Sequence, residues 1–408
     1  MNGNAILGGY RSDFARNFRK EGRSISDLVA EVVEGTLAAS GIRADAVETI
    51  HLANAFGELY TGQGHLGAMP ATAVAGLWGT PAMRHEGACA SGSLAMLSAM
   101  AELEAGRYDC ALVVGAEIER SLPGPQAAAV QAAAAHVGYE TDEPGLLWPS
   151  TFDRIAGAYD QRYGVDERHL RAIGRKNLEN AKANPNAQTR SWAFGEASFS
   201  DDDAANPVVA GRLRRNDCCQ ITDGGAGIVL VSDRWLRRNP PHTARARITG
   251  WGHRTVGLSL EAKLERTCGS RWVMPHVREA IEEAFRRAAI ASVDDLDLIE
   301  THDCMTPSEY LAIDHFGITA PGESWKAIEE GTLERDGRIP MNPSGGLIGG
   351  GHPVGATGIR MLVDVTAQLS DEAGEMQIEG AQRAATLNIG GSTATTVSFV
   401  VARGEATS

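Results

Sequence analysis

Residues 86–106 read Glu-Gly-Ala-Cys-Ala-Ser-Gly-Ser-Leu-Ala-Met-Leu-Ser-Ala-Met-Ala-Glu-Leu-Glu-Ala-Gly, a glycine turn that runs into a helical pattern. Leucine and methionine residues follow Cys89 with helical spacing until Gly106, which suits a helix end. Cys89 is therefore expected in the first turn of this helix, where free amide donors and the helix dipole favour a thiolate. The alternative is a small cysteine buried under a glycine turn.

The order of elements around this turn occurs twice in the chain. The pairs are the strands 5–11 and 247–254, the helices 26–40 and 275–290, the strands 47–56 and 296–305, the glycine turns with helices 89–106 and 352–369, and the final strands 110–115 with 228–231 and 384–390 with 397–401. Alternating helices and apolar strands predict an α/β fold with parallel or mixed sheets covered by helices. The sequence thus predicts two duplicated halves.

One segment interrupts the first half. About a hundred residues, 118–217, separate its last two strands, which is far more chain than an ordinary connection needs. The segment holds several prolines, a polar helical stretch near 167–182 and the acidic run 201–203. Long insertions in α/β folds commonly form lids and substrate walls. We expect an inserted domain that covers Cys89.

Composition narrows the class of protein. The chain has 408 residues, 43% of them apolar, and a formal net charge of −14, which argues against nonspecific binding to nucleic acid or to an anionic membrane. Its six cysteines show no Cys-x-x-Cys spacing, no basic and apolar leader opens the sequence, and no apolar run could span a bilayer. These features favour a cytoplasmic protein with reduced thiols.

Several motifs together resemble the thiolase superfamily, and within it the branch related to sterol carrier protein 2 thiolases. In chain order they are Cys-x-Ser-Gly (89–92), Asn-Pro-Asn-Ala-Gln (184–188), Asp-Cys-Cys-Gln-Ile-Thr-Asp-Gly-Gly-Ala (217–226), His-Asp-Cys-Met (302–305), Asn-Pro-Ser-Gly-Gly (342–346), Gly-His-Pro-x-Gly-Ala-Thr-Gly (351–358) and Asn-Ile-Gly-Gly (388–391). The resemblance covers nearly the whole chain. It implies the thiolase fold, in which two βαβαβαββ halves form a five-layer αβαβα sandwich with an inserted loop domain.

The expected boundaries follow from the repeat and the insertion. Residues 1–117 and 218–242 form the N-terminal half, residues 118–217 the inserted cover domain, and residues 243–408 the C-terminal half. In a thiolase, a cysteine attacks a thioester substrate and carries the acyl group, which assigns the nucleophile to Cys89. His352 stands on a glycine-rich loop at the start of another helix and fits the role of its base. The alternative for His352 is a surface turn histidine.

Chemistry at the α-carbon of the second acyl group requires another acid or base. In the better-known thiolases a cysteine of a Cys-x-Gly motif near the C-terminus has this role, but Asn388 holds that place here. The sterol carrier branch uses the cysteine of a His-Asp-Cys-Phe motif, which corresponds to Cys304. Met305 replaces the aromatic residue of that motif. A buried structural cysteine at 304 is the alternative.

Negative charge on the thioester oxygens requires two sets of hydrogen-bond donors. We assign one oxyanion hole to His302 with His352, and the resemblance implies that the backbone amides of Cys89 and Gly390 form the other. His302 could instead be a core histidine whose ring is satisfied by neighbours. No metal site is expected, because the remaining histidines show no ligand spacing.

Coenzyme A carries phosphates, so cations are expected at its entry despite the acidic total. The candidates are Arg212, Arg214 and Arg215, and beyond them Lys263, Arg266 and Arg271, although charged clusters are more often solvated faces. Coenzyme A would act as a cosubstrate, with no tightly bound cofactor, since no phosphate-binding glycine motif is present.

The leading hypothesis is a thiolase of lipid metabolism, an acyltransferase that cleaves 3-oxoacyl-CoA or runs the reverse Claisen condensation. The alternative is a retro-aldolase or scaffold subunit that works with a partner containing an OB-fold and a zinc ribbon. Members of that kind generally lack the nucleophilic cysteine, so Cys89 argues against it. The family implies a homodimer or homotetramer. The sequence leaves acyl chain length and reaction direction open.

Overall fold

The computed structural model describes residues 4–140 and 146–404, and in them nine strands form one mixed sheet. Their order across the sheet is β3 (Ala82–His85), β2 (Thr49–Ala53), β4 (Cys110–Glu117), β7 (Gly224–Val231), β1 (Asn4–Arg11), β8 (Ala246–Thr255), β11 (Thr395–Arg403), β10 (Arg383–Gly390) and β9 (Leu298–Thr301). The strands from β3 to β1 come from the first half of the chain and those from β8 to β9 from the second. The halves meet where Asn4–Ile6 of β1 pairs with β8.

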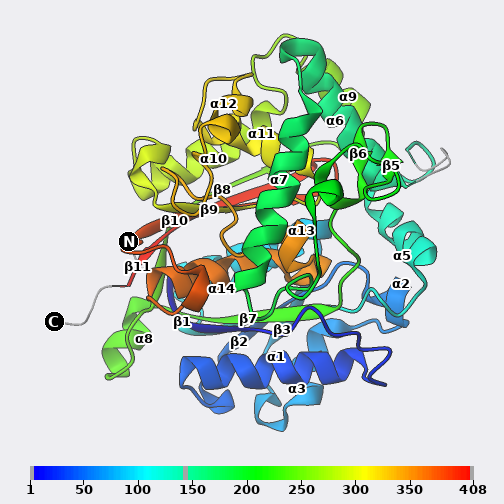
Figure 1. The fold of residues 1–408 in the computed structure, drawn as a ribbon. Helices are drawn as coiled ribbons and strands as arrows, with labels where there is room; N and C mark the ends of the chain where they lie inside the picture. The colour runs from blue at the N-terminus through cyan, green and yellow to red at the C-terminus, as the bar shows by residue number, and fades with distance from the viewer. Residues whose placement is uncertain (1–3, 141–145, 405–408) are drawn as a thin grey trace.

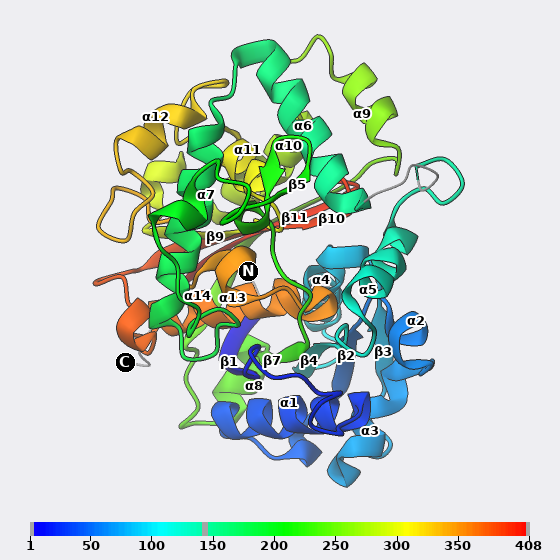
Figure 2. The same ribbon diagram turned by 45° about the vertical axis from the view of Figure 1, so that its right-hand side comes forward.

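Helices cover both faces of the strands of each half, so the molecule is built in layers (Figures 1 and 2). Helices α1 (Ile25–Ser40) and α3 (Met69–Ala73) cover the outer face of the first half. Helices α4 (Ser91–Glu104) and α14 (Thr357–Leu369) lie between the two halves. Helices α10 (Pro275–Ala288) and α11 (Thr306–Phe316) cover the outer face of the second half. The predicted five-layer arrangement is confirmed.

The middle layer contains an apolar core shared by both halves. Small and medium side chains of α4 and α14 pack against β4 and β7 on one side and against β8 and β11 on the other. Burial of such side chains contributes about 25 cal/mol per Å² of apolar surface, which holds the halves together. Because α4 follows Cys89 and α14 follows His352, this packing brings the two glycine turns to the same place.

The duplication is visible element by element. The series β1, α1, β2, α4, β4, β7 in the first half corresponds to β8, α10, β9, α14, β10, β11 in the second. Strand β3 pairs in parallel with β2, and its counterpart in the second half is reduced to a single parallel bridge between Ile299 and Met341. The sequence periodicity therefore placed the repeated elements within a few residues of their observed bounds.

The described residues of the segment 118–217 form several helices and one short hairpin. They include α5 (Gly124–Gln131), α6 (Leu147–Tyr163), α7 (Glu167–Asn180) and the short hairpin of β5 (Val208–Ala210) and β6 (Leu213–Arg214). Helices α6 and α7 pack against α11. The remaining helices are α2 (Gly57–Thr61), α8 (Asp233–Arg238), α9 (Leu260–Arg266), α12 (Ser324–Glu329) and α13 (Gly346–Gly350). Among the described helices, none has the length and apolar character needed to cross a bilayer.

Candidate active site

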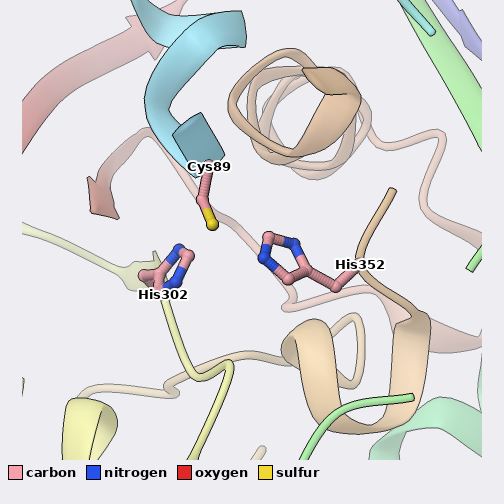
Figure 3. A group of neighbouring side chains, drawn as sticks. All are labelled: Cys89, His302 and His352. Atoms are coloured by element: carbon pink, nitrogen blue, oxygen red, sulfur yellow. The ribbon is translucent and has the colours of Figure 1, made fainter. Parts of the chain in front are cut away.

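Three side chains from both halves of the molecule meet in one cavity. The sulfur of Cys89 and ring nitrogens of His302 and His352 all lie within 4.8 Å of one another. Figure 3 shows the sulfur directed between the two imidazole rings. Residues of the insertion contribute to the wall, as predicted for a cover. Besides the three, the lining residues are Phe56, Gln131, Ala134, Trp148, Phe152, Cys219, Cys304, Met305, Val354 and Gly391.

The backbone holds Cys89 at the tip of a tight turn. Ala88 has a φ of 51°, a left-handed conformation that is unfavourable for a residue with a side chain. The turn is fastened by Ser91, whose hydroxyl accepts from the Gly87 amide at 3.0 Å and donates to the Ala88 carbonyl at 2.6 Å. Local hydrogen bonds thus keep the thiol aimed into the cavity.

The resting sulfur of Cys89 is a thiol, not the thiolate expected from its position near a helix N-terminus. Burial and the nearby Glu119 carboxylate raise the pKa of Cys89 to about 12. Hydrogen bonds from the backbone amides of Gly391 and of Cys89 itself oppose this rise but do not overcome it. The expectation of a free thiolate was wrong because desolvation outweighs the helix terminus. Cys89 therefore needs a base to become a nucleophile.

His352 is arranged as that base. The Thr357 hydroxyl lies 2.7 Å from Nδ1 of His352 and donates its own proton to the Pro353 carbonyl at 3.1 Å, so it accepts from Nδ1–H. The lone pair is then on Nε2, which is buried and has no hydrogen-bond partner in the described chain. Burial, with the positive charge of Arg360, lowers the pKa of His352 to about 3. The ring is therefore neutral at rest with a free lone pair on Nε2, and the lowered pKa makes it a weaker base than an exposed imidazole.

His302 follows β9 and faces His352 edge to face, with ring centroids 5.2 Å apart. Its Nδ1 lies 3.3 Å from the side-chain nitrogen of Asn388. Burial, His352 and Arg360 keep the pKa of His302 well below its usual value, so this ring is also neutral. One cysteine and two neutral histidines also have the composition of a zinc site. The sequence analysis grouped these three residues through their motifs and not through spacing, because they are far apart in the chain.

Cys304 brings a second thiol to the same cavity. The segment before β7 runs antiparallel to it, with a bridge between Cys218 and Met305 and a hydrogen bond of 2.8 Å from the Cys219 amide to the Cys304 carbonyl. Burial and the neighbouring sulfurs of Cys219 and Cys89 raise the pKa of Cys304 well above its usual value. Cys304 is therefore protonated at rest and suits an acid that donates to carbon.

Buried carboxylates fix the loops that carry the histidines. Glu117 accepts from the Gly355 amide at 3.1 Å, and Glu119 accepts from the Val354 amide at 2.8 Å. Asp303 accepts from the first amides of α13, including that of Leu347 at 2.6 Å. The sequence analysis did not identify these roles. The signal it could have used is the pair of acidic residues at alternate positions as an apolar strand ends.

The glycines at the end of β10, Gly390 and Gly391, allow two backbone segments to approach each other beside Cys89. A Cβ atom on Gly390 would lie 2.3 Å from the Gly87 carbonyl oxygen, so no larger residue fits there. Gly390 itself is still paired with Thr395 in the sheet, and it is the Gly391 amide that hydrogen bonds to the Cys89 sulfur. The predicted role of the Gly390 amide in an oxyanion hole stays a prediction.

Of the cations predicted to meet coenzyme A, one is well placed. Arg215 is exposed and lines a second cavity of about 380 Å³. This cavity shares five lining residues with the first: Gln131, Trp148, Cys219, Met305 and His352. Among described residues Arg215 has no ion-pair partner. It remains a candidate for the phosphates of coenzyme A.

Three of the other predicted cations are engaged elsewhere. Arg212 pairs with Asp153 at 2.9 Å and Arg214 with Asp203 at 2.7 Å. Lys263 is buried, with Nζ donating to the Ser392 hydroxyl at 2.7 Å and to the Leu258 carbonyl at 3.0 Å. Burial lowers the pKa of Lys263 to about 8. The amine points into the protein beside the Gly391 loop, so this arrangement does not support the predicted nucleotide contact of Lys263, which stays a prediction.

Comparisons with known proteins agree with this geometry. Residues 4–234 match the family described as thiolase, N-terminal domain, and residues 263–403 match thiolase C-terminal domain-like. The chain belongs to the thiolase family. It is 31% identical over 380 residues to an acetyl-CoA acetyltransferase of Methanothermobacter thermautotrophicus, covering 93% of this chain and 95% of that protein. It is 27% identical over 379 residues to sterol carrier protein 2 of Bos taurus, covering 91% of this chain and 67% of that protein.

Solved structures share the fold. One, described as "Ltp2-ChsH2(DUF35) aldolase", superimposes with a TM-score of 0.77 at 20% identity and covers 98% of both chains. An acetyl-CoA acetyltransferase from Syntrophomonas wolfei gives a TM-score of 0.69 at 18% identity and covers 99% of both chains. At these identities the likeness establishes the thiolase fold and leaves the reaction to be argued from the site.

Proposed function

We propose that this protein is a thiolase that transfers an acyl group between Cys89 and coenzyme A and makes or breaks a carbon–carbon bond in the process. The observation that carries the proposal is the meeting of a cysteine, an unpartnered imidazole nitrogen of His352 and a second thiol, Cys304, in one cavity. A nucleophile, its base and a separate acid for carbon are the groups that this reaction requires. The substrate class is a 3-oxoacyl-CoA or, in reverse, two acyl-CoA molecules.

The first half-reaction forms the acyl-enzyme. Nε2 of His352 takes the proton of Cys89, and the sulfur attacks the 3-oxo carbon of the substrate. When the tetrahedral intermediate collapses, the bond between C2 and C3 breaks and the electron pair stays on C2 as an enolate. The enolate takes a proton from Cys304 and leaves as acetyl-CoA, while Cys89 keeps the shortened acyl group as a thioester.

The second half-reaction returns the enzyme to its starting state. The Cys304 thiolate takes the proton of the incoming coenzyme A thiol, and that sulfur attacks the acyl carbon on Cys89. The Cys89 sulfur leaves and recovers its proton from His352. The elevated pKa of Cys304 suits this cycle, because a strongly basic thiolate removes the coenzyme A proton readily.

Intact-mass measurement tests the two cysteine roles separately. After incubation with an acyl-CoA, the wild type is expected to gain one acyl group, and Cys89→Ala to gain none and to lose turnover. Cys304→Ala is expected to keep the acyl adduct and lose carbon–carbon cleavage. Cys268→Ser, at an exposed cysteine, is the matched control and should behave as the wild type. Full thiolysis by Cys89→Ala would refute the assignment.

A second candidate is a thiolase-like subunit that acts with a partner protein. The structural neighbour whose description joins Ltp2 with ChsH2(DUF35) as an aldolase motivates it. Retention of Cys89 favours the acyl-enzyme route for this chain. Co-expression with neighbouring genes, followed by purification through a tag on this chain, distinguishes the two. A subunit that forms no acyl adduct alone but cleaves carbon–carbon bonds with its partner would favour the second candidate.

A further inference from the structure

Asn388 lies behind His302 at the end of a chain of hydrogen bonds that begins in α4. The Ser93 hydroxyl donates to the side-chain oxygen of Asn388 at 2.9 Å, and the Asn388 amide nitrogen faces Nδ1 of His302 at 3.3 Å. All three residues are about 1% exposed. Water therefore does not compete for these contacts, and each group must be satisfied by its neighbour.

The direction of this chain of hydrogen bonds determines which nitrogen of His302 carries the proton. Because Ser93 donates to the oxygen of the Asn388 amide, the amide nitrogen is turned toward the ring. An amide nitrogen only donates, so Nδ1 of His302 must accept. In a neutral imidazole the proton is then on Nε2. His302 is a donor through Nε2, whereas His352 is an acceptor through the same atom.

Close packing between α4 and α14 surrounds this chain of hydrogen bonds. A Cβ atom on Gly358, in the first turn of α14, would lie 2.3 Å from the Ser93 hydroxyl and 2.5 Å from the Asn388 side-chain oxygen. Glycine at 358 thus leaves room for the hydrogen bond between Ser93 and Asn388, which a side chain at this position would disrupt.

We propose that Asn388, oriented by Ser93, is a positioning residue that holds the proton of His302 on Nε2 and makes that ring a hydrogen-bond donor to the substrate's thioester oxygen. Only the role toward substrate rests on the proposed thiolase function. The same tautomer leaves Nε2 of His302 without a lone pair for a metal, which favours the oxyanion role over the zinc composition of the set. Asn388 occupies the place of a catalytic cysteine in other thiolases. In this protein it acts on the reaction indirectly, by fixing the tautomer of His302.

Asn388→Asp tests the proposal, because a carboxylate has nearly the shape of the amide but can only accept. Nδ1 of His302 would then carry the proton, and the neutral ring would lose its donor. Removal of one oxyanion donor typically lowers kcat by about 10²–10³-fold, and we expect a loss of that order near pH 8 with little change in KM. The new carboxylate beside the ring favours its protonated form, and protonation toward pH 6 restores Nε2–H, so the variant should recover relative to the wild type.

Other groups that face His302 must be counted in that pH profile. They are His352 and Cys89 across the cavity, Cys304 on the same turn and Arg360 from α14. All of them are present in both proteins. The ratio of variant to wild-type activity therefore isolates the change at residue 388. A structural defect would lower activity without such recovery in acid.

A measurement on the folded protein separates this proposal from the proposed function. Nitrogen-15 NMR of labelled histidines, assigned with His302→Gln and His352→Gln, should show His302 protonated on Nε2 and His352 on Nδ1. This readout requires no turnover, so it holds even if the enzyme is not a thiolase. A wild-type spectrum with the His302 proton on Nδ1 would overturn the proposal, as would an Asn388→Asp variant of wild-type activity.

Two further variants guard against simple misfolding. Ser93→Ala removes the group that orients the amide and should give a smaller loss of the same kind, with a mixture of His302 tautomers. Thr396→Val, on the neighbouring strand, removes a buried hydroxyl that has no partner among described residues and should leave activity unchanged. If Thr396→Val lost activity as strongly as Asn388→Asp, the effect would belong to the packing of the strands.

Discussion

Replacing the Thr357 hydroxyl with a methyl group, in Thr357→Val, should slow acylation of Cys89 without unfolding the protein. The hydroxyl is buried and accepts from Nδ1 of His352 at 2.7 Å. It is the contact that keeps the His352 lone pair on Nε2, toward the sulfur. Valine has a similar shape but offers no acceptor, so Nδ1–H is left unpaired and the ring gains from moving its proton to Nε2, where it can no longer act as a base.

The size of the effect follows from the cost of an unsatisfied buried polar group, about 1–3 kcal/mol. If that cost falls on the catalytically competent tautomer, the acylation rate constant drops roughly 5- to 150-fold, at about 1.4 kcal/mol for each factor of ten. Thr357→Ser keeps the hydroxyl and should retain most of the wild-type rate. Any decrease in the rate of Thr357→Ser should come only from the lost packing of one methyl group.

The assay is single-turnover acylation, followed by acid quench and intact mass. Thr366→Val is the matched control, because Thr366 lies in the same helix and its buried hydroxyl has no partner in the described chain. Both valine variants should show closely similar thermal unfolding midpoints. Acylation by Thr357→Val within a factor of two of the wild-type rate would refute the reasoning that Thr357 sets the tautomer of His352.

Three other predictions concern charge. Because the pKa of Cys89 is raised to about 12, its alkylation by iodoacetamide, followed on the Cys89 peptide, should rise about tenfold per pH unit from about pH 7 to 10; a plateau below about pH 8 would contradict this. Arg215→Ala should raise KM for coenzyme A several-fold, less so at high salt, with Arg212→Ala as the paired-cation control. In the folded protein the pKa of Lys263 is lowered to about 8, against 10.5 for an exposed lysine. Between these two pH values the unfolded chain binds one more proton than the folded protein, so the free energy of unfolding rises with pH. Urea titrations should show that Lys263→Met lacks this rise, of at most about 1.4 kcal/mol per pH unit.

The repeated halves and the chemical identity of the site could be predicted from the sequence because both are written in local patterns. Helical spacing after Cys89 and again after His352, each preceded by glycines, indicated two equivalent turns. The central helices α4 and α14 confirm that equivalence. The order of the motifs was enough to identify the family, because motifs are recognised from residue types along the chain and need no knowledge of distances in the fold.

The sequence by itself therefore determined the duplicated α/β fold, the thiolase family and the residue types of the cavity. The tertiary structure alone decided the state of each group. A helix start pointed to a thiolate at Cys89, but surrounding residues from both halves desolvate the sulfur and raise its pKa. Charge suggested a nucleotide contact for Lys263, but the fold buries its amine beside Ser392. Protonation, tautomer and pairing depend on neighbours distant in the chain, and only packing supplies those neighbours.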